Sequence, residues 1–491
     1  MNFAGQVLER APAGRLALLE LARDGRRREW SYGEVAESSA RLAGSLSERG
    51  IGRGDVVMTL IGNRPEWVLT MVACFRLGAV VLPCTEQLRA KDLRLRIATA
   101  RPALIVADER TRGELQAAAG EVAIVYVPDE SLFAAEPPPL AELDPGDPCL
   151  LSFTSGTAGE PKAVVHAQRY LDGQRLQAEH WLGARPGELV WCTAASGWSK
   201  SARNAFIAPW LCGAAALLHD ARFDPAERLE LLERENVGVL CMAPTEYRVI
   251  AKRVAVRAPR SLRAMVAAGE ALNPEVLRAW RQATGLDIRD GYGQTETGQL
   301  TGAPDGEPAR PGSMGRALPG VVLAIREGEL VLDPTSVPTF FLGYLGEHVQ
   351  RRADGSWRIE DRREGGLWRT GDRVGEDADG WLHFEGRNDD VIVSAGYRIG
   401  PFEVESALVA HPAVAEAAAV AAPDEERGAV VRAVVVLREG SPPPSPELIR
   451  ELQDHVKRET APYKYPRIVD FAAELPKTAS GKIKRAELRL G

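Results

Sequence analysis

The first 300 residues of the chain alternate short, continuous apolar runs with longer amphipathic segments. VVMTLIG at 56–62 is followed by PEWVLTMVACFRLG at 65–78, where Pro65 suits a first helical turn and Gly78 suits the residue after the last one. Unbroken Val, Ile, Leu and Ala runs with helices between them are typical of parallel strands buried on both faces. The pattern therefore predicts an α/β fold with mixed, mostly parallel sheets flanked by helices. Further strands are expected at AVVLPC (79–84), ALIVAD (103–108), VAIVYV (122–127), VGVLCMAP (237–244) and LRAMVAAG (262–269).

The sequence pattern changes at two points along the chain. After about Gly302, glycine and proline become frequent and short alternating strands follow, which predicts a β-rich subdomain at about 303–387 with antiparallel pairs. From Asn388 the order of apolar and amphipathic segments is β-α-β-β-α, which predicts a small α+β unit. We therefore expect a large N-terminal domain at 1–387 and a small, mobile C-terminal domain at 388–491.

Composition excludes several classes of protein. The 491 residues carry 61 Lys+Arg and 68 Asp+Glu, a net charge of -7, which argues against a nucleic-acid binder. The longest uncharged stretch, 204–219, contains Pro209 and Gly213, so no membrane span is expected. The N-terminus shows no signal peptide, and early Glu9 and Glu20 do not fit a mitochondrial address. None of the six cysteines forms a CxxC pair, which indicates buried thiols in a reducing compartment, and we expect a cytoplasmic protein.

A loop of small residues between two apolar runs is the first candidate for a binding site. TSGTAGEPK at 154–162 follows CLLSF and precedes AVVHAQ. Its glycines permit close backbone approach, its N–H groups and hydroxyls can surround phosphate oxygens, and its lysine adds a cation. A plain surface hairpin is the alternative. The expected nucleotide-phosphate contacts are Thr154, Ser155, Gly156, Thr157, Gly159 and Lys162.

A P-loop kinase or ATPase is the main rival explanation for this loop. That motif needs GxxxxGK[ST] running into a helix, whereas here Pro161 separates the glycines from the lysine and a strand follows. TSGTAGEPK instead resembles the phosphate loop of the adenylate-forming enzymes, a superfamily of acyl-CoA synthetases, luciferases and peptide-synthetase adenylation domains. Four other stretches carry the same resemblance: DGYGQTETG (290–298), WRTGD (368–372), GRNDDVI (386–392) and PKTASGKIKR (476–485).

The resemblance implies a set of nucleotide contacts. It places Tyr292 against adenine, Asp372 on both ribose hydroxyls and Arg387 on ribose or phosphate. Taken without the resemblance, these segments would be ordinary turns. The other residues assigned to ATP or AMP are Gly269, Glu270, Asp290, Gly291, Gly293 and Gln294.

The resemblance also implies the catalytic groups. Thr295 is placed near the α-phosphate, Glu296 and Thr154 near Mg²⁺, and Lys482 matches the family's catalytic lysine. A carboxylate would attack the α-phosphorus of ATP and expel pyrophosphate, and a thiol would then attack the acyl carbon and expel AMP. Because two anions meet in the first step, positive charge and positioning should dominate catalysis.

A second face of the C-terminal domain is implied for CoA. The family rotates this domain about a hinge at Asp389, which removes Lys482 from the site and brings in the segment SAGYRIGP (394–401). Ordinary surface charge is the alternative for Arg427, Tyr465 and Arg467. The implied CoA contacts are Ala395, Gly396, Tyr397, Arg398, Arg427, Tyr465 and Arg467.

The acid is constrained by PCTEQLRAKDL (83–93) and GWSKSARNAFIAPW (197–210), which resemble medium-chain acyl-CoA synthetases and benzoate-CoA ligases. Trp198, Ser199 and Lys200 are expected to border the acyl pocket, with core packing as the alternative for Trp198. Apolar Phe206 and Trp210 favour a hydrophobic acid, either medium-chain, branched or aromatic, and no acidic residue stands out to pair with a substrate amine. Gly291, which precedes the tyrosine, either widens this pocket or suits the turn, so chain length stays open.

The sequence thus predicts an ATP-dependent acid–thiol ligase whose partners are a small carboxylic acid, ATP with Mg²⁺, and CoA. An adenylating module that loads a carrier protein and a non-catalytic adenylate-binding regulator are the alternatives. Lys482, Glu296 and Asp372 together favour an enzyme. A monomer and a homodimer are both compatible with the sequence.

Overall fold

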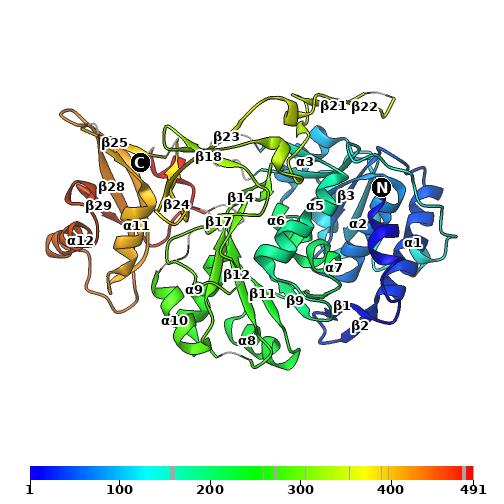
Figure 1. Cartoon of the computed structure of the whole chain (residues 1–491), viewed down its shortest axis with the longest axis horizontal. Helices are drawn as coiled ribbons and strands as arrows, with labels where there is room; N and C mark the ends of the chain where they lie inside the picture. The colour runs from blue at the N-terminus through cyan, green and yellow to red at the C-terminus, as the bar shows by residue number, and fades with distance from the viewer. Residues whose placement is uncertain are drawn as a thin grey trace.

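The computed structural model describes residues 1–154, 161–257, 259–269, 272, 274–304, 306–352, 354–388, 390–395, 397–477 and 483–489. Two seven-stranded sheets form the main body. The last elements of the chain gather at one end of the molecule, opposite the N-terminal helices α1 (Tyr32–Glu48) and α2 (Pro65–Leu77) (Figure 1). This arrangement confirms the predicted α/β class with a small C-terminal domain.

One sheet carries the predicted phosphate loop. It has the order β20-β8-β7-β4-β3-β5-β6, parallel from β6 to β7 and antiparallel across β7–β8 and β8–β20. Every residue of β3 and β4 is buried, as expected for strands covered on both faces. Its strands are β3 (Val56–Leu60), β4 (Val80–Cys84), β5 (Leu104–Asp108), β6 (Ala123–Val127), β7 (Pro148–Phe153), β8 (Ala163–Ala167) and β20 (Gly343–Tyr344).

The other large sheet has the order β13-β12-β11-β9-β10-β1-β2 and is parallel except for β2 at its edge. Ligands of such sheets bind beyond the carboxyl ends of the strands. The segments that follow β9, β12 and β13 are those predicted to form the acyl and nucleotide sites. Its strands are β1 (Leu16–Leu21), β2 (Arg27–Ser31), β9 (Leu189–Cys192), β10 (Ala215–His219), β11 (Val239–Cys241), β12 (Ala264–Ala268) and β13 (Ile288–Gly291).

Helices cover both large sheets, and their ends follow local chemistry. Pro65 stands at the first position of α2, and Gly78 ends this helix with φ 72°. The helix α6, the π-helical turn Arg203–Ile207 and α7 follow one another without a break. The remaining helices of this part are α3 (Ala90–Ala100), α4 (Arg112–Gln116), α5 (Arg169–Gln177), α6 (Ser199–Ala202), α7 (Ala208–Leu211), α8 (Pro225–Arg234), α9 (Pro244–Arg253) and α10 (Pro274–Thr284).

The region after Gly302 is β-rich, as predicted. A four-stranded sheet of order β18-β19-β23-β24 is antiparallel throughout, and it brings Asp372 opposite Arg387. The strands of this sheet and of the short hairpins beside it are β14 (Gly293–Gln294), β15 (Gly298–Gln299), β16 (Thr301–Gly302), β17 (Arg316–Ala317), β18 (Leu323–Arg326), β19 (Glu329–Leu332), β21 (Val349–Arg351), β22 (Trp357–Ile359), β23 (Trp368–Glu376) and β24 (Leu382–Arg387).

The described part of the C-terminal domain contains the predicted elements and also β26, a 3-10 turn at Pro462–Lys464, β29 and α13. The strands β27 and β28 pair antiparallel, and β29 adds to β28 in parallel. Among the described residues, no helix is both long and apolar enough to cross a membrane. The elements are β25 (Ile392–Ser394), β26 (Tyr397–Ile399), α11 (Pro401–Ala410), β27 (Val414–Asp424), β28 (Gly428–Leu437), α12 (Pro446–Glu459), β29 (Ile468–Phe471) and α13 (Arg485–Arg489).

Candidate active site

A large cleft joins the carboxyl ends of the two sheets to the C-terminal domain. Its walls come from the segments after β9, β12 and β13, from β23 and β24, and from α11 and α13 of the C-terminal domain. The described residues predicted for nucleotide binding line this cleft: Thr154, Lys162, Gly269, Asp290, Gly291, Tyr292, Gly293, Gln294, Thr295, Glu296, Asp372 and Arg387. The predicted residues Ser155, Gly156, Thr157, Gly159, Glu270, Asp389, Gly396 and Lys482 lie outside the described residues.

The predicted adenosine contacts form one hydrogen-bonded group. The Tyr292 hydroxyl donates to Asp372 Oδ2 at 2.5 Å, and the Gln294 amide donates to the same oxygen at 2.9 Å. Gln294 in turn accepts a hydrogen bond from the Trp368 indole at 3.2 Å and donates to the Thr370 carbonyl at 2.7 Å. The carboxylate of Asp372 is thus held in a fixed orientation in which it can accept hydrogen bonds from a diol.

Two carboxyl groups of this segment are shifted by burial. Burial raises the pKa of Asp290 to about 8, so this side chain is neutral at pH 7, and its Oδ1 accepts the Gly291 N–H at 2.8 Å. Burial also raises the pKa of Glu296, against the hydrogen bond that the Tyr344 hydroxyl donates to Oε1 at 2.8 Å. A cation bound near such a buried carboxylate would stabilise its ionised form and so lower its pKa again.

The donor set fits Mg²⁺ that arrives with a nucleotide. Glu296 and Thr154 offer hard oxygen atoms to the same cleft. In the described parts of the chain, no three or more His, Cys, Asp or Glu side chains form a cluster that could hold a metal ion. Mg²⁺ in phosphoryl-transfer sites is commonly held by one or two carboxylates together with substrate phosphates, which is the arrangement these residues allow.

Two hydrogen bonds close the base of the predicted phosphate loop. The Thr154 N–H donates to the Lys162 carbonyl at 2.9 Å, and the Lys162 N–H donates to Thr154 Oγ1 at 3.0 Å. The Lys162 ammonium lies 2.8 Å from Glu347 Oε1 and 4.7 Å from the centre of the Tyr344 ring. Thr154 and Lys162 thus extend the antiparallel pairing of β7 and β8, and the Lys162 side chain lines the cleft.

His166 was not predicted from the sequence, and it supports the site through a contact with the backbone of Thr295. The ring is fully buried, packs at 4.0 Å from the Tyr170 ring, and has Nε2 at 2.9 Å from the Thr295 carbonyl. Burial lowers its pKa to about 3, so the neutral ring donates from Nε2 and fixes the backbone beside Glu296. Its position in the apolar run of β8 was the available signal, but a lone histidine there does not reveal its partner.

We expect this buried histidine to make stability depend on pH. The ring stays neutral in the fold down to pH about 3, whereas the unfolded chain binds the proton near pH 6.5. The unfolding free energy should therefore fall as pH drops below about 6.5, by up to about 1.4 kcal/mol per pH unit from this group. Urea denaturation at a series of pH values should show a shallower slope for His166→Gln than for the wild type. Exposed His180→Gln is the control, and parallel curves for His166→Gln and the wild type would contradict the assignment.

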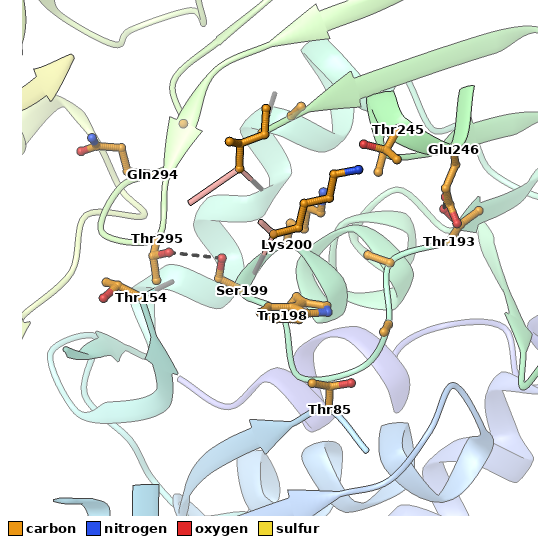
Figure 2. A pocket seen from close by; sticks show the side chains of 18 of the residues that line it. Thr85, Thr154, Thr193, Trp198, Ser199, Lys200, Thr245, Glu246, Gln294 and Thr295 are labelled. Carbon is orange, nitrogen blue, oxygen red and sulfur yellow. Dashed lines mark hydrogen bonds between the residues drawn. The ribbon is translucent and has the colours of Figure 1, made fainter. Parts of the chain in front are cut away.

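The predicted acyl residues form the other half of the cleft (Figure 2). Trp198, Ser199 and Lys200 line it, and the Thr295 hydroxyl lies 3.4 Å from Ser199 Oγ, which links the acyl side to the nucleotide side. Thr193 and Glu246 line the same cavity, and the Thr193 hydroxyl donates to the Glu246 carboxylate. No acidic residue was expected on this side, because Glu246 is distant in sequence from the acyl segment.

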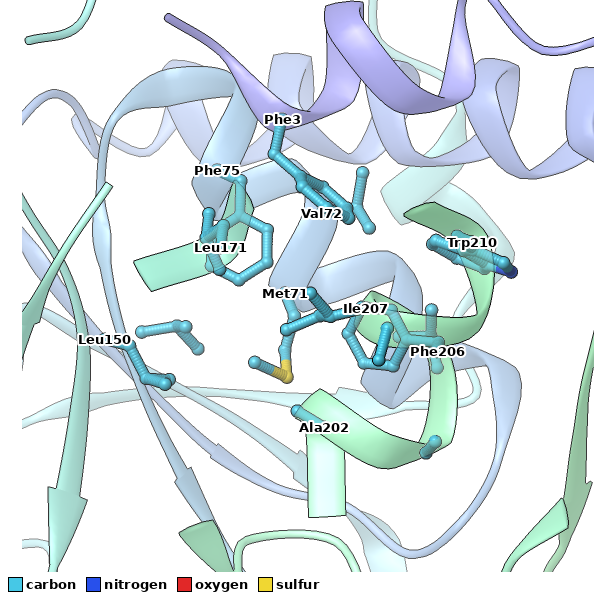
Figure 3. Close-up of a cluster of buried hydrophobic side chains, with 14 of the residues drawn as sticks. Phe3, Met71, Val72, Phe75, Leu150, Leu171, Ala202, Phe206, Ile207 and Trp210 are labelled. Carbon is cyan, nitrogen blue, oxygen red and sulfur yellow. The ribbon is translucent and has the colours of Figure 1, made fainter. Parts of the chain in front are cut away.

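The structure gives three residues surroundings that differ from those assumed when the type of acid was inferred. Phe206 and Trp210 are buried in the core, where Phe206 packs against Trp67 and Trp210 donates to the Ala17 carbonyl, so the inference from these two side chains was wrong (Figure 3). A Cβ on Gly291 would meet the Trp181 indole nitrogen and the Thr301 carbonyl, both at 2.7 Å. This glycine therefore permits close internal packing and does not widen the pocket.

The two predicted faces of the C-terminal domain are in different places. Lys477 and Ile483 form a β-bridge, and both line the cleft, so the ends of the segment that contains Lys482 are at the active site. The described side chains predicted for CoA do not line the cleft: Ala395, Tyr397, Arg427, Tyr465 and Arg467. Tyr397 stacks on Tyr463 at 4.4 Å and is 52% exposed. Arg398 belongs to β26, on the same hairpin.

Comparisons with known proteins agree with this geometry. The profile of the AMP-binding enzyme family matches residues 6–345, and the profile of the AMP-binding enzyme C-terminal domain matches residues 403–482. The chain is 40% identical over 499 residues to the acyl-coenzyme A synthetase ACSM4, mitochondrial, of Homo sapiens, a match that covers 94% of this chain and 84% of that protein.

Solved structures show the same similarity. The anthranilate CoA ligase AuaEII in complex with anthranoyl-AMP matches with a TM-score of 0.87 at 28% identity, over 99% of this chain and 96% of that one. A benzoate CoA ligase from Burkholderia xenovorans LB400 matches with a TM-score of 0.86 at 26% identity, over 100% of both chains. The chain belongs to the AMP-binding enzyme family. Within that family it is an AMP-forming acyl-CoA ligase that uses ATP and CoA, which confirms the predicted class.

Proposed function

We propose that this ligase joins CoA to a carboxylic acid with a hydrophobic body, medium-chain, branched or aromatic, and that both half-reactions occur in the cleft described above. The observation that supports this most directly is the contact between Thr295 and Ser199, at 3.4 Å, which brings the predicted α-phosphate position next to the acyl side. Trp198 and Phe223 add apolar surface to the acyl side of the lining. A carboxylate bound there would be close to the phosphorus that it attacks.

In the first half-reaction, the carboxylate attacks the α-phosphorus and pyrophosphate leaves. The substrate is already ionised at neutral pH, so no general base is needed. Asp372 and Tyr292 would hold the nucleoside, and Lys482 would bring a cation to the two approaching anions. Glu296 and Thr154 would hold Mg²⁺, which neutralises charge on the phosphates when it is bound.

In the second half-reaction, the CoA thiol attacks the acyl carbon and AMP leaves. We propose that the domain at 388–491 turns about Asp389 relative to the domain at 1–387, whose β-rich part is at about 303–387. This rotation would exchange the segment of Lys482 for the hairpin of Tyr397. Lys477 and Ile483 line the cleft whereas Tyr397 does not, which supports an arrangement suited to adenylation. A cytoplasmic location and a monomeric or homodimeric state remain part of the proposal.

A panel of carboxylic acids in pyrophosphate exchange, followed by CoA-dependent AMP release, tests the proposed function. We expect exchange with at least one medium-chain, branched or aromatic acid and release of AMP only after CoA is added. Exchange without CoA-dependent release would favour a carrier-protein partner. Exchange with no acid at all would favour an adenylate-binding regulator and contradict the proposal.

A further inference from the structure

Lys200 is a cation on the acyl side of the cleft with no partner in the described part of the chain. It follows Ser199 on α6, is half-buried, and makes no hydrogen bond or ion pair with any described residue. Its ammonium lies beside the end of β12, because a Cβ placed on Gly269 would be 3.6 Å from Nζ. An ammonium group that is partly removed from water and lacks a counter-charge is costly, and a ligand can supply that charge.

The acidic residue on this side already has partners. Glu246 Oε1 lies 3.5 Å from Arg228 Nη2, and Oε2 accepts a hydrogen bond from the Thr193 hydroxyl. Arg228 is itself buried over the Trp191 ring at 4.4 Å. The single negative charge of Glu246 is therefore matched by Arg228, and no described carboxylate forms an ion pair with Lys200.

The Lys200 side chain points away from the reacting centre. In Figure 2 its side chain extends away from the Thr295–Ser199 pair and toward the side formed by Thr245 and Glu246. The carboxylate that reacts has to lie near Thr295, so the ammonium of Lys200 is in position to meet a different part of the acid.

We propose that the preferred substrate is an acid with a second carboxylate at the far end of its hydrophobic body, and that Lys200 binds this second carboxylate. The proposal rests on the proposed function and specifies its substrate class. The ion pair holds the distal carboxylate away from the α-phosphorus, so that only the proximal carboxylate is activated. Lys200 is then a specificity-determining residue, and the product is a CoA thioester that retains one free carboxylate.

Matched acids test this assignment directly. Hexanoate is compared with hexanedioate and benzoate with benzene-1,3-dicarboxylate, and pyrophosphate release gives kcat and KM for each. We expect the wild type to favour the diacid of at least one pair by about tenfold or more. Lys200→Met should lower kcat/KM for that diacid by about 10- to 100-fold, mainly through KM, because a charged hydrogen bond is lost. The loss should be larger for the diacid than for its matched monoacid, so the ratio of the two kcat/KM values reports the ion pair separately from any change in the shape of the pocket.

Two further variants make the result decisive. Lys200→Glu should reverse the preference toward acids with a terminal amine, such as aminohexanoate, because the sign of the charge is reversed. Lys484→Met removes a lysine that is 42% exposed, pairs with Glu487 and does not line the cleft, and it should leave the acid profile unchanged. If thermal unfolding shows that a Lys200 variant is not folded, the ratio of kcat/KM for the diacid to that for the monoacid in the wild type still decides the question.

Three results would count against the inference. A wild type that favours the monoacid of every pair would overturn it while leaving the ligase function intact. So would a Lys200→Met variant that folds and keeps full diacid activity. Activation of no acid at all would contradict the proposed function, and the inference would fall with it.

Discussion

Replacement of Lys482 by alanine is expected to lower adenylate formation by about 100-fold or more while the fold is retained. The first half-reaction brings a carboxylate and a triphosphate together, and a positioned cation that stabilises the developing charge is worth about 3–4 kcal/mol. Thiolysis of supplied acyl-AMP should survive much better, because that step needs no cation between two anions. The two rates are measured separately, by pyrophosphate release and by AMP release from the preformed adenylate.

The neighbouring lysine supplies a control for this variant. Lys484 lies 2.8 Å from Glu487, is 42% exposed and does not line the cleft, so Lys484→Ala should change neither half-reaction. An equal loss of both half-reactions in Lys482→Ala would contradict the proposed role. A loss of thermal stability in Lys482→Ala alone would point to a structural role for this residue.

Much of the architecture could be predicted because its signals are local. The strands β3 and β4 are continuous apolar runs, and α2 has a proline at its start and a glycine at its end, so the residues that form these elements also mark their ends. Short strands that pair with a distant part of the chain were harder to predict. The strand β29 pairs in parallel with β28 across the intervening α12, and no periodicity in four residues predicts such a pairing.

The candidate site divides in the same way. Tyr292, Gln294 and Asp372 were predicted from motifs, and the structure joins them in one hydrogen-bonded group although Asp372 is 80 residues from Tyr292 and 78 from Gln294 in the chain. Glu246 and His166 were missed, because each acts through a contact with a distant residue and neither belongs to a motif. Phe206 and Trp210 are apolar and close in sequence to Trp198, yet the helical run turns them into the core. Nearness in sequence does not decide which face of a helix a residue occupies.

Glu296→Gln is expected to lower adenylate formation by about 100- to 1000-fold. The substitution keeps the size of the side chain and its ability to accept the hydrogen bond from Tyr344, which lies at 2.8 Å in the wild type, but it removes the negative charge. The expected loss follows from charge alone, since a neutral amide oxygen binds Mg²⁺ far more weakly than a carboxylate does. The Mg²⁺ concentration needed for half-maximal rate should rise in the same variant.

The hydrogen bond and the charge of Glu296 can be separated by a second variant. Tyr344→Phe removes the donor and leaves the carboxylate, so its adenylation rate should fall by no more than about tenfold. Thiolysis of supplied acyl-AMP needs no pyrophosphate leaving group and should be nearly unchanged in both variants. If Glu296→Gln retained the wild-type dependence on Mg²⁺, the metal would be held by other groups. The carboxylate would then serve only to fix Tyr344 at the wall of the cleft.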